Sequence, residues 1–110
     1  MKLPNGERAF VDIAKLRDYC LNPNHDDGKH KARVFASALG LRRSDAEWLR
    51  QRLLEAATHE TAIVTSETLF GTIYMIKFGV TTVAGSVIIN SNWIIRNAED
   101  FPRLVTCYVK

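Results

Sequence analysis

Cysteine, proline and long hydrophobic stretches are all scarce in this sequence. Its 110 residues include only two cysteines, Cys20 and Cys107, and three prolines. Two cysteines are too few for a disulfide framework and match no metal-ligand spacing, which predicts two reduced, buried thiols. No apolar run approaches the roughly 18 residues that a membrane-spanning helix needs, and no hydrophobic signal core follows the first residues. We therefore expect a cytoplasmic protein that does not enter a membrane.

Neither charge nor composition is typical of a disordered, fibrous or coiled-coil chain. Hydrophobic residues make up 46% and charged residues 25% of the sequence, as in an ordinary globular domain. A chain of this length has room for one hydrophobic core, so residues 1–110 are expected to form a single domain. The net charge of +3 permits a polyanionic partner without requiring one. Most basic residues lie in the first half, either on a solvated helical surface or on a patch that faces phosphate.

The first half of the chain has the signals of three helices. Asp12 is expected to cap the first helix. A second helix is predicted over residues 29–39 and should end at Gly40. A third is predicted to begin with a capping box of Ser44 and Glu47 and to run to about residue 58. The side chains that these helices should place in the core are Phe35, Trp48, Leu49, Leu53, Leu54 and Ala57.

The second half of the chain has the composition of strands. Runs rich in Val, Ile, Thr, Tyr and Phe occupy residues 61–66, 71–80, 86–96 and 103–109. Their short connections favour antiparallel pairing, because parallel strands need crossovers of a dozen residues or more. The sequence therefore predicts an α+β domain, with N-terminal helices packed on a C-terminal, mostly antiparallel sheet of four or more strands.

Side chains alternate between the two faces of a strand, which predicts the surroundings of residues 103–109. The face against the helices is expected to hold Val105, Cys107 and Val109. The open face is expected to hold Leu104, Thr106 and Tyr108. With Arg103 at its start, this open face is a candidate concave surface for RNA, and Trp93 in the preceding strand is a candidate for stacking on a base. The alternative is packing for Trp93 and Tyr108, and strand propensity alone for Thr106.

The densest group of reactive side chains lies between residues 25 and 33. It consists of His25, Lys29, His30, Lys31 and Arg33. One interpretation is acid–base cleavage of a phosphodiester, in which one group takes the proton of the 2′-hydroxyl and another protonates the leaving 5′-oxygen. Histidine is suited to these proton transfers, and lysine and arginine are suited to stabilising the charge on the phosphorane.

Two other interpretations of this cluster remain open. His25, Asp26 and His30 could hold a metal, but histidines five residues apart across a glycine loop do not form the usual helical pair, and no His-Glu-x-x-His motif is present. The cluster is otherwise a solvated basic surface. We therefore expect no metal and no other cofactor.

Motifs spread over nearly the whole chain resemble a family of small bacterial domains of unassigned function. These motifs are Leu3-Pro4-Asn5-Gly6-Glu7-Arg8-Ala9, Lys15-Leu16-Arg17-Asp18-Tyr19-Cys20-Leu21-Asn22-Pro23, His25, Gly28-Lys29-His30-Lys31-Ala32-Arg33-Val34-Phe35, Leu39-Gly40, Trp93-Ile94 and Pro102-Arg103-Leu104-Val105-Thr106-Cys107-Tyr108-Val109. Such domains occur as small stand-alone proteins and at the ends of large polymorphic toxins, often beside a gene for a small β-rich partner.

The pattern is also similar, more distantly, to the ribonuclease superfamily of barnase, EndoU, colicin and RelE-like toxins. Members of that superfamily place one or two helices before a four- or five-stranded antiparallel sheet. They cleave RNA, often tRNA or mRNA, without a metal. The resemblance therefore implies a small, toxin-type, metal-independent ribonuclease.

The resemblance also assigns roles by position. His25 or His30 would transfer the proton, Lys31 and Arg103 would bind or stabilise the phosphate, and Thr106 would position it. Further contacts with the substrate are expected from Lys29, Arg33, Trp93 and Tyr108. A working site requires the catalytic groups to line one cleft, within about 10 Å of one another.

The chain departs from the family pattern at Asp26-Asp27, where a proline and a small or apolar residue are commoner. These acids lie beside a candidate catalytic histidine and would repel a phosphate. The expected partners are RNA and a small acidic antitoxin or immunity-type protein, which would cover residues 29–33 and 103–108. The alternative function is a non-catalytic binding module, either an antitoxin- or immunity-like partner or a nucleic-acid adaptor, and the alternative assembly is a free monomer or a homodimer.

Overall fold

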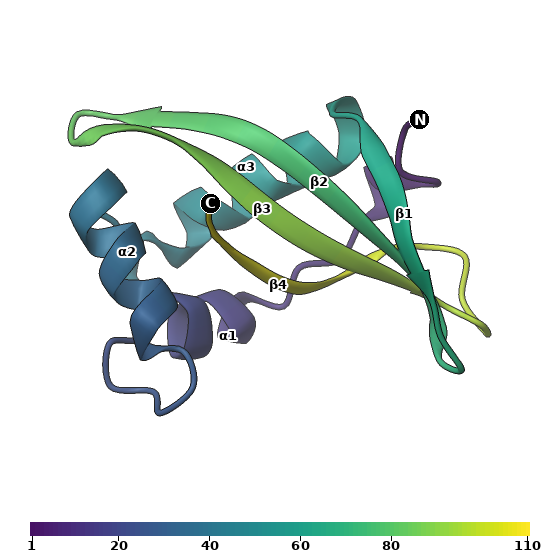
Figure 1. The fold of residues 1–110 in the computed structure, drawn as a ribbon, viewed down its shortest axis with the longest axis horizontal. Coiled ribbons are helices and arrows are strands. Elements are labelled where there is room, and N and C mark those ends of the chain that lie inside the picture. The colour runs from purple at the N-terminus through teal and green to yellow at the C-terminus, as the bar shows by residue number, and fades with distance from the viewer.

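Three helices come first in the chain and four strands follow them (Figure 1). The computed structural model describes residues 1–110. The helices are α1 (Ile13–Lys15), which continues as the π-helical segment η2 (Leu16–Cys20), α2 (Lys29–Leu39) and α3 (Ala46–His59). The strands are β1 (Ala62–Glu67), β2 (Gly71–Thr82), β3 (Gly85–Arg96) and β4 (Arg103–Val109). They form one antiparallel sheet in the order β1-β2-β3-β4, which confirms the predicted α+β architecture.

Two of the helix ends follow the predicted local chemistry. The carboxylate of Asp12 accepts a hydrogen bond from the amide of Ala14 at 3.0 Å, so Asp12 caps the first helix. Helix α2 ends at Gly40, whose φ of 70° lies in the left-handed region that glycine adopts at low cost. None of the helices combines the length and the apolar composition needed to span a bilayer.

The start of α3 differs from the prediction: Ser44 and Glu47 do not form the predicted capping box. A short 3-10 turn, η3 (Arg43–Asp45), precedes the helix. The carboxylate of Asp45 accepts a hydrogen bond from the amide of Arg42 at 2.8 Å, so the cap forms at Arg42 instead. Glu47 is then free to accept hydrogen bonds from side chains in the following turn.

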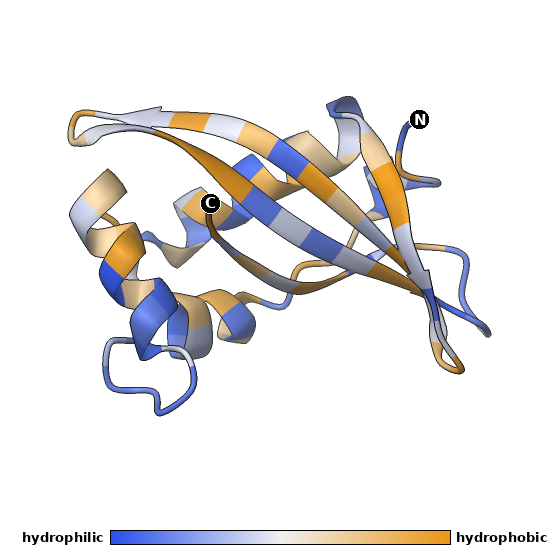
Figure 2. Ribbon diagram, viewed as in Figure 1, coloured by the Kyte–Doolittle hydropathy of each residue, from blue (hydrophilic) through white to orange (hydrophobic).

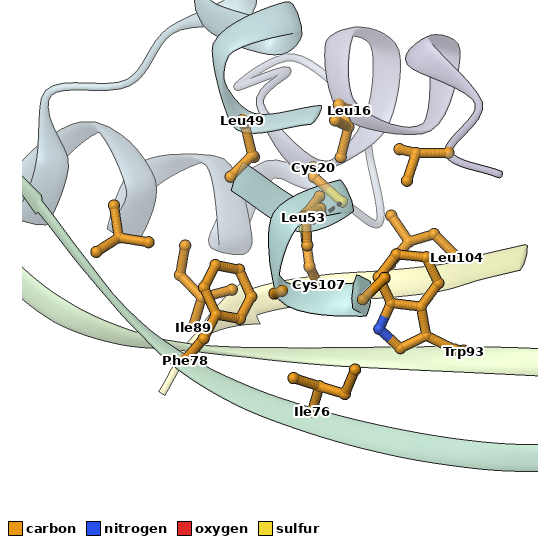
Figure 3. Packing of buried hydrophobic residues seen from close by; sticks show 14 of the residues in the cluster. Leu16, Cys20, Leu49, Leu53, Ile76, Phe78, Ile89, Trp93, Leu104 and Cys107 are labelled. Carbon is orange, nitrogen blue, oxygen red and sulfur yellow. Dashed lines mark hydrogen bonds between the residues drawn. The ribbon is translucent and has the colours of Figure 1, made fainter. Parts of the chain in front are cut away.

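The core lies between the helices and one face of the sheet (Figures 1 and 3). Phe35, Leu49 and Leu53 are fully buried in it, as predicted. Trp48 was expected there too, but it is only half-buried at the margin of the core. Its ring lies 5.3 Å from the guanidinium of Arg52. An indole at the margin keeps one face on the core and offers the other to a cation.

Strand β4 does not alternate as predicted, because it contains a bulge. Asn92 pairs with Thr106 and Trp93 pairs with Leu104, which leaves Val105 without a partner on β3. The extra residue interrupts the alternation of side chains along β4. Side chains before the bulge therefore lie on the face opposite to the one that strict alternation predicts. Leu104 is therefore buried and Val105 is 38% exposed, the reverse of the prediction, whereas Cys107 is buried as predicted.

Asp18 links η2 to the segment before α3. Its carboxylate accepts hydrogen bonds from the guanidinium groups of Arg17 and Arg43 at 2.8–3.0 Å. These bonds lower the pKa of Asp18 from 3.8 to about 2. A carboxylate with a lowered folded-state pKa stabilises the protein above its unfolded pKa, and this stabilisation disappears as the pH falls through the folded value.

We therefore expect the advantage in stability of the native protein over Asp18→Asn to shrink between pH 4 and pH 2. Urea unfolding of both proteins across this range measures the effect, and the other carboxylates cancel because they are present in both. A difference in unfolding free energy that is constant with pH would contradict the role given to these hydrogen bonds.

Candidate active site

The loop before α2 is held tightly against η2. A Cβ atom added to Gly28 would lie 2.2 Å from the carbonyl oxygen of Tyr19, so only glycine fits here. The Nδ1 atom of His25 accepts hydrogen bonds from the amides of Asp27 and Gly28, both at 3.0 Å. The ring of His25 also meets the ring of Tyr19 edge-on, with 4.9 Å between centroids. His25 therefore fixes the loop, and its Nδ1 is already occupied as an acceptor.

Lys31 is the most firmly placed cation near this loop. Its Nζ donates a hydrogen bond to the hydroxyl of Tyr19 at 2.8 Å and lies 4.9 Å from the centroid of the same ring. The hydrogen bond to Tyr19 raises the pKa of Lys31, although partial burial opposes this shift. Lys31 is thus a permanently charged ammonium in a fixed position, suited to stabilising an anion and unsuited to accepting a proton.

Lys31, His30 and Tyr108 share one cavity. It lies between α2 and the end of β4, has a volume of about 360 Å³ and is also lined by Val34 and Val109. His30 is exposed, and Lys31 and Tyr108 are half-buried. The residues around the cavity therefore carry an imidazole, a fixed ammonium and a phenol, which are groups that can transfer protons and stabilise a developing negative charge.

Arg103 does not belong to this cavity, so the predicted common cleft is wrong for this residue. Arg103 and Tyr108 are about 16 Å apart along β4. Arg103 lines a separate cavity of about 560 Å³ with Lys15 and Arg96. Its guanidinium donates two hydrogen bonds to Glu99, at 2.7 and 2.8 Å, and this pairing lowers the pKa of Glu99. A guanidinium that already donates two hydrogen bonds to a carboxylate cannot bind a phosphate through the same two N–H groups.

Two further residues have surroundings that exclude the roles expected for them. Trp93 is fully buried and donates from Nε1 to the hydroxyl of Ser91 at 3.0 Å, so it cannot stack on a base. The indole is part of the core (Figure 3). The hydroxyl of Thr106 is also buried, without a hydrogen-bond partner, and therefore cannot position a phosphate. Trp93 therefore has the alternative role given above, which is packing in the core.

The remaining basic residues of the cluster lie around α2. Lys29 is half-buried at the first position of the helix. Arg33 is exposed and lines a different cavity, of about 440 Å³, with Arg42 and Arg43. No group of three or more His, Cys, Asp or Glu side chains is arranged to hold a metal ion. The cluster of residues 25–33 is therefore divided among several surroundings, and His30 and Lys31 are the two members that line the cavity beside β4.

Two cysteines lie close to Lys31. Cys20 and Cys107 are free and buried, as predicted, with 4.0 Å between their sulfur atoms (Figure 3). The hydrogen bond from Cys107 lowers the pKa of Cys20 to about 7, against the effect of burial. The hydrogen bond to Cys20 and complete burial raise the pKa of Cys107. Any negative charge in this pair is therefore carried by Cys20, on the side where Lys31 contributes a positive charge.

Tyr19 is a member of the site that the sequence did not indicate. It lies in η2, where the amide of Leu21 bonds to the carbonyl of Leu16 at 2.8 Å, five residues earlier in the chain. This wider turn places Leu16 and Cys20 in the core and leaves Tyr19 facing Lys31. In the sequence Tyr19 looks like one more aromatic residue of an amphipathic helix, and no signal marks the π-helical turn.

These features define an α+β domain with a small cavity beside an edge strand. The chain belongs to the family described as "Domain of unknown function (DUF6883)", whose model matches residues 2–110. No curated protein and no solved structure matches the chain. The match confirms the expected membership in an uncharacterised family.

Proposed function

We propose that this protein is a toxin-type, metal-independent ribonuclease whose active site is the cavity lined by His30, Lys31 and Tyr108. The observation that carries the proposal is the fixed position of Lys31. Its ammonium is held at 2.8 Å by Tyr19, and Lys31 lines one cavity with His30 and Tyr108. Cleavage of RNA without metal requires these kinds of group: a base, an acid and a cation.

In the proposed reaction, His30 accepts the proton of the ribose 2′-hydroxyl while the 2′-oxygen forms a bond to phosphorus. Lys31 stabilises the extra negative charge on the phosphorane. The bond between phosphorus and the 5′-oxygen then breaks, and the phenol of Tyr108 donates its proton to that oxygen. The proton held by His30 returns to Tyr108 through solvent. The products are a 2′,3′-cyclic phosphate and a 5′-hydroxyl, and no water is consumed.

The roles assigned here differ from those implied by family resemblance. His25 keeps the loop in place, and Arg103 and Thr106 lie outside the cavity. Tyr108 changes from a substrate contact to the proton donor. The carboxylates of Asp26 and Asp27, which would repel a phosphate, do not line the cavity. Both residues are exposed in the loop before α2.

The proposal is tested with purified protein, total tRNA and a defined oligoribonucleotide in the presence of EDTA. We expect cleavage at the same rate with and without EDTA, and products that end in a 2′,3′-cyclic phosphate by mass spectrometry. The matched control is a 2′-O-methyl oligonucleotide of the same sequence, which lacks the nucleophile and should stay intact.

Expression in cells tests the toxin setting with the same protein. An active ribonuclease should arrest growth unless the expected small acidic partner is expressed with it, because that partner would occupy the basic cavity. Intact RNA at micromolar protein, together with high yield and no growth arrest when the chain is expressed alone, would contradict both the ribonuclease and its inhibitor. The non-catalytic binding module would then be the better description.

A further inference from the structure

The helices cover one face of the sheet and leave the other open (Figure 1). The open face carries a second polar cluster. The strand register places Lys77, Asn90 and Tyr108 side by side on β2, β3 and β4, since Lys77 pairs with Asn90 and Asn90 pairs with Tyr108. Their neighbours in the same strands, Ile76, Ile89 and Cys107, are buried against the helices. Because successive side chains alternate between faces, the three polar residues point to the open side.

Lys110 adds a second cation to this row. Its amide donates to the carbonyl of Ile88 at 2.8 Å, which extends the pairing of β3 and β4 by one step. Ile88 pairs in turn with Gly79, which has no side chain to block the space beside it. The ammonium of Lys110 therefore lies close to that of Lys77 and lowers the pKa of Lys77.

No acidic side chain balances these two positive charges. The ion pairs of the molecule all involve other residues, so neither Lys77 nor Lys110 has an acidic partner. Two ammonium groups held close together without a counter-ion repel each other. A pair of this kind is favourable only when an anion lies between its members, and conflicts between local energy and fold are commonest at functional sites.

One neutral donor, the phenol of Tyr108, accompanies the two lysines. Asn90 is only 2% exposed and donates a hydrogen bond to Asn92 at 3.4 Å, so its amide belongs to the sheet and is not accessible to a ligand. None of the hydrogen bonds within the chain involves the hydroxyl of Tyr108, which lies across from Asn90. Figure 2 shows hydrophilic bands crossing the middle of β2 and β3 among more hydrophobic ones. The polar groups are thus gathered in one place on a partly apolar face.

We propose that Lys77, Lys110 and Tyr108 form a binding site for a phosphate-type oxyanion on the open face of the sheet. Two ammonium groups supply the charge, and the phenol supplies a neutral hydrogen bond. Tyr108 also lines the cavity beside α2, so the site adjoins the proposed active site. In the context of the proposed ribonuclease, the ligand is a second phosphate of the same RNA strand; the oxyanion site itself does not depend on cleavage.

The test separates free phosphate from RNA and uses the full chain. Isotope-labelled protein is titrated with inorganic pyrophosphate and, separately, with an uncleavable 2′-O-methyl oligonucleotide, and backbone amide shifts are followed by NMR. We expect saturable shifts at residues 77, 88–90 and 108–110. The double variant Lys77→Met/Lys110→Met should bind each probe about tenfold more weakly or worse. Lys2→Met removes one charge beside β1, at the opposite edge of the sheet, and should leave both affinities unchanged.

Stability provides an independent measurement. In buffer without phosphate, removing either lysine should leave the unfolding midpoint unchanged or raise it, because the repulsion is relieved. Added pyrophosphate should raise the midpoint of the native protein and not that of the double variant. Shifts that are absent, or equal in native and double-variant protein, would overturn the site. Shifts with pyrophosphate but not with the oligonucleotide would keep the oxyanion site and remove RNA as its ligand, whatever the outcome of the cleavage assay.

Discussion

Leu53→Ala is expected to lower the free energy of unfolding by about 2–5 kcal/mol, the range for leucine truncations that leave a cavity in a packed core. Leu53 is fully buried on the side of α3 that faces the sheet, close to the cysteine pair (Figure 3). The surrounding side chains come from both layers, and they cannot all move into the space that the substitution leaves.

The neighbouring Leu54 offers a matched control. Leu54→Ala removes the same atoms from the same helix turn, but Leu54 is only half-buried at the margin of the core. Its cost should be the smaller of the two, since less contact is lost and water can fill the space. Urea unfolding with equal m-values gives both numbers. Equal costs for the two variants would show that α3 presents a different face to the sheet.

The difference between Leu53 and Leu54 also shows how far sequence patterns reach. Helical spacing of apolar residues indicated α3, but it placed Leu53, Leu54 and Trp48 together in one buried stripe. The width of a stripe depends on what packs against it. Here α3 lies on a twisted sheet, so residues at the edges of the stripe are only partly covered. The period of the pattern was sufficient to predict helix α3. It was not sufficient to predict which residues of α3 are buried in the core.

The candidate site was harder to predict for a related reason. Its parts come from η2, α2 and β4. Two irregularities in these elements are marked by no pattern in the chain, and the contact between Tyr19 and Lys31 depends on the first of them. The π-helical turn after Lys15 presents Tyr19 to Lys31. The bulge at Val105 reverses the faces on one side of β4, which places Leu104 in the core. A rule based on strict alternation therefore misplaced Leu104 and Val105 while it placed Cys107 correctly.

The side chains that pair with the basic residues could not be predicted from the sequence either. Arg103 looked like a free cation at the start of a strand, yet the turn before β4 brings Glu99 to within 2.7 Å of its guanidinium. Lys31 looked like one of several equivalent basic residues, but its contact with Tyr19 sets it apart. The number of cations near a phosphate site can be counted from a sequence, whereas their availability depends on tertiary contacts.

Lys31→Met should lower kcat/KM for RNA cleavage by about 10²- to 10³-fold, the usual loss when one stabilising group for a transition-state charge is removed. Methionine keeps most of the aliphatic length of lysine and removes the ammonium. The hydrogen bond of Lys31 to Tyr19 is lost as well, so unfolding midpoints must be measured beside the rates to show that the fold survives. Lys2→Met, which removes a charge beside β1, should leave kcat/KM unchanged.

Two further variants separate charge from position at Lys31. Lys31→Arg restores the charge and should recover part of the activity, although the planar guanidinium cannot reproduce the contact with the Tyr19 hydroxyl and ring. Tyr19→Phe keeps the ammonium and removes the hydroxyl that fixes it, so kcat should fall less than in Lys31→Met because the charge remains but is less well placed. If Lys31→Met cleaves RNA at the native rate while its fold is intact, the active site is not at this cavity. If all three Lys31 and Tyr19 variants lose activity only in proportion to their loss of folded protein, the contact is structural, and the catalytic role of Lys31 is wrong.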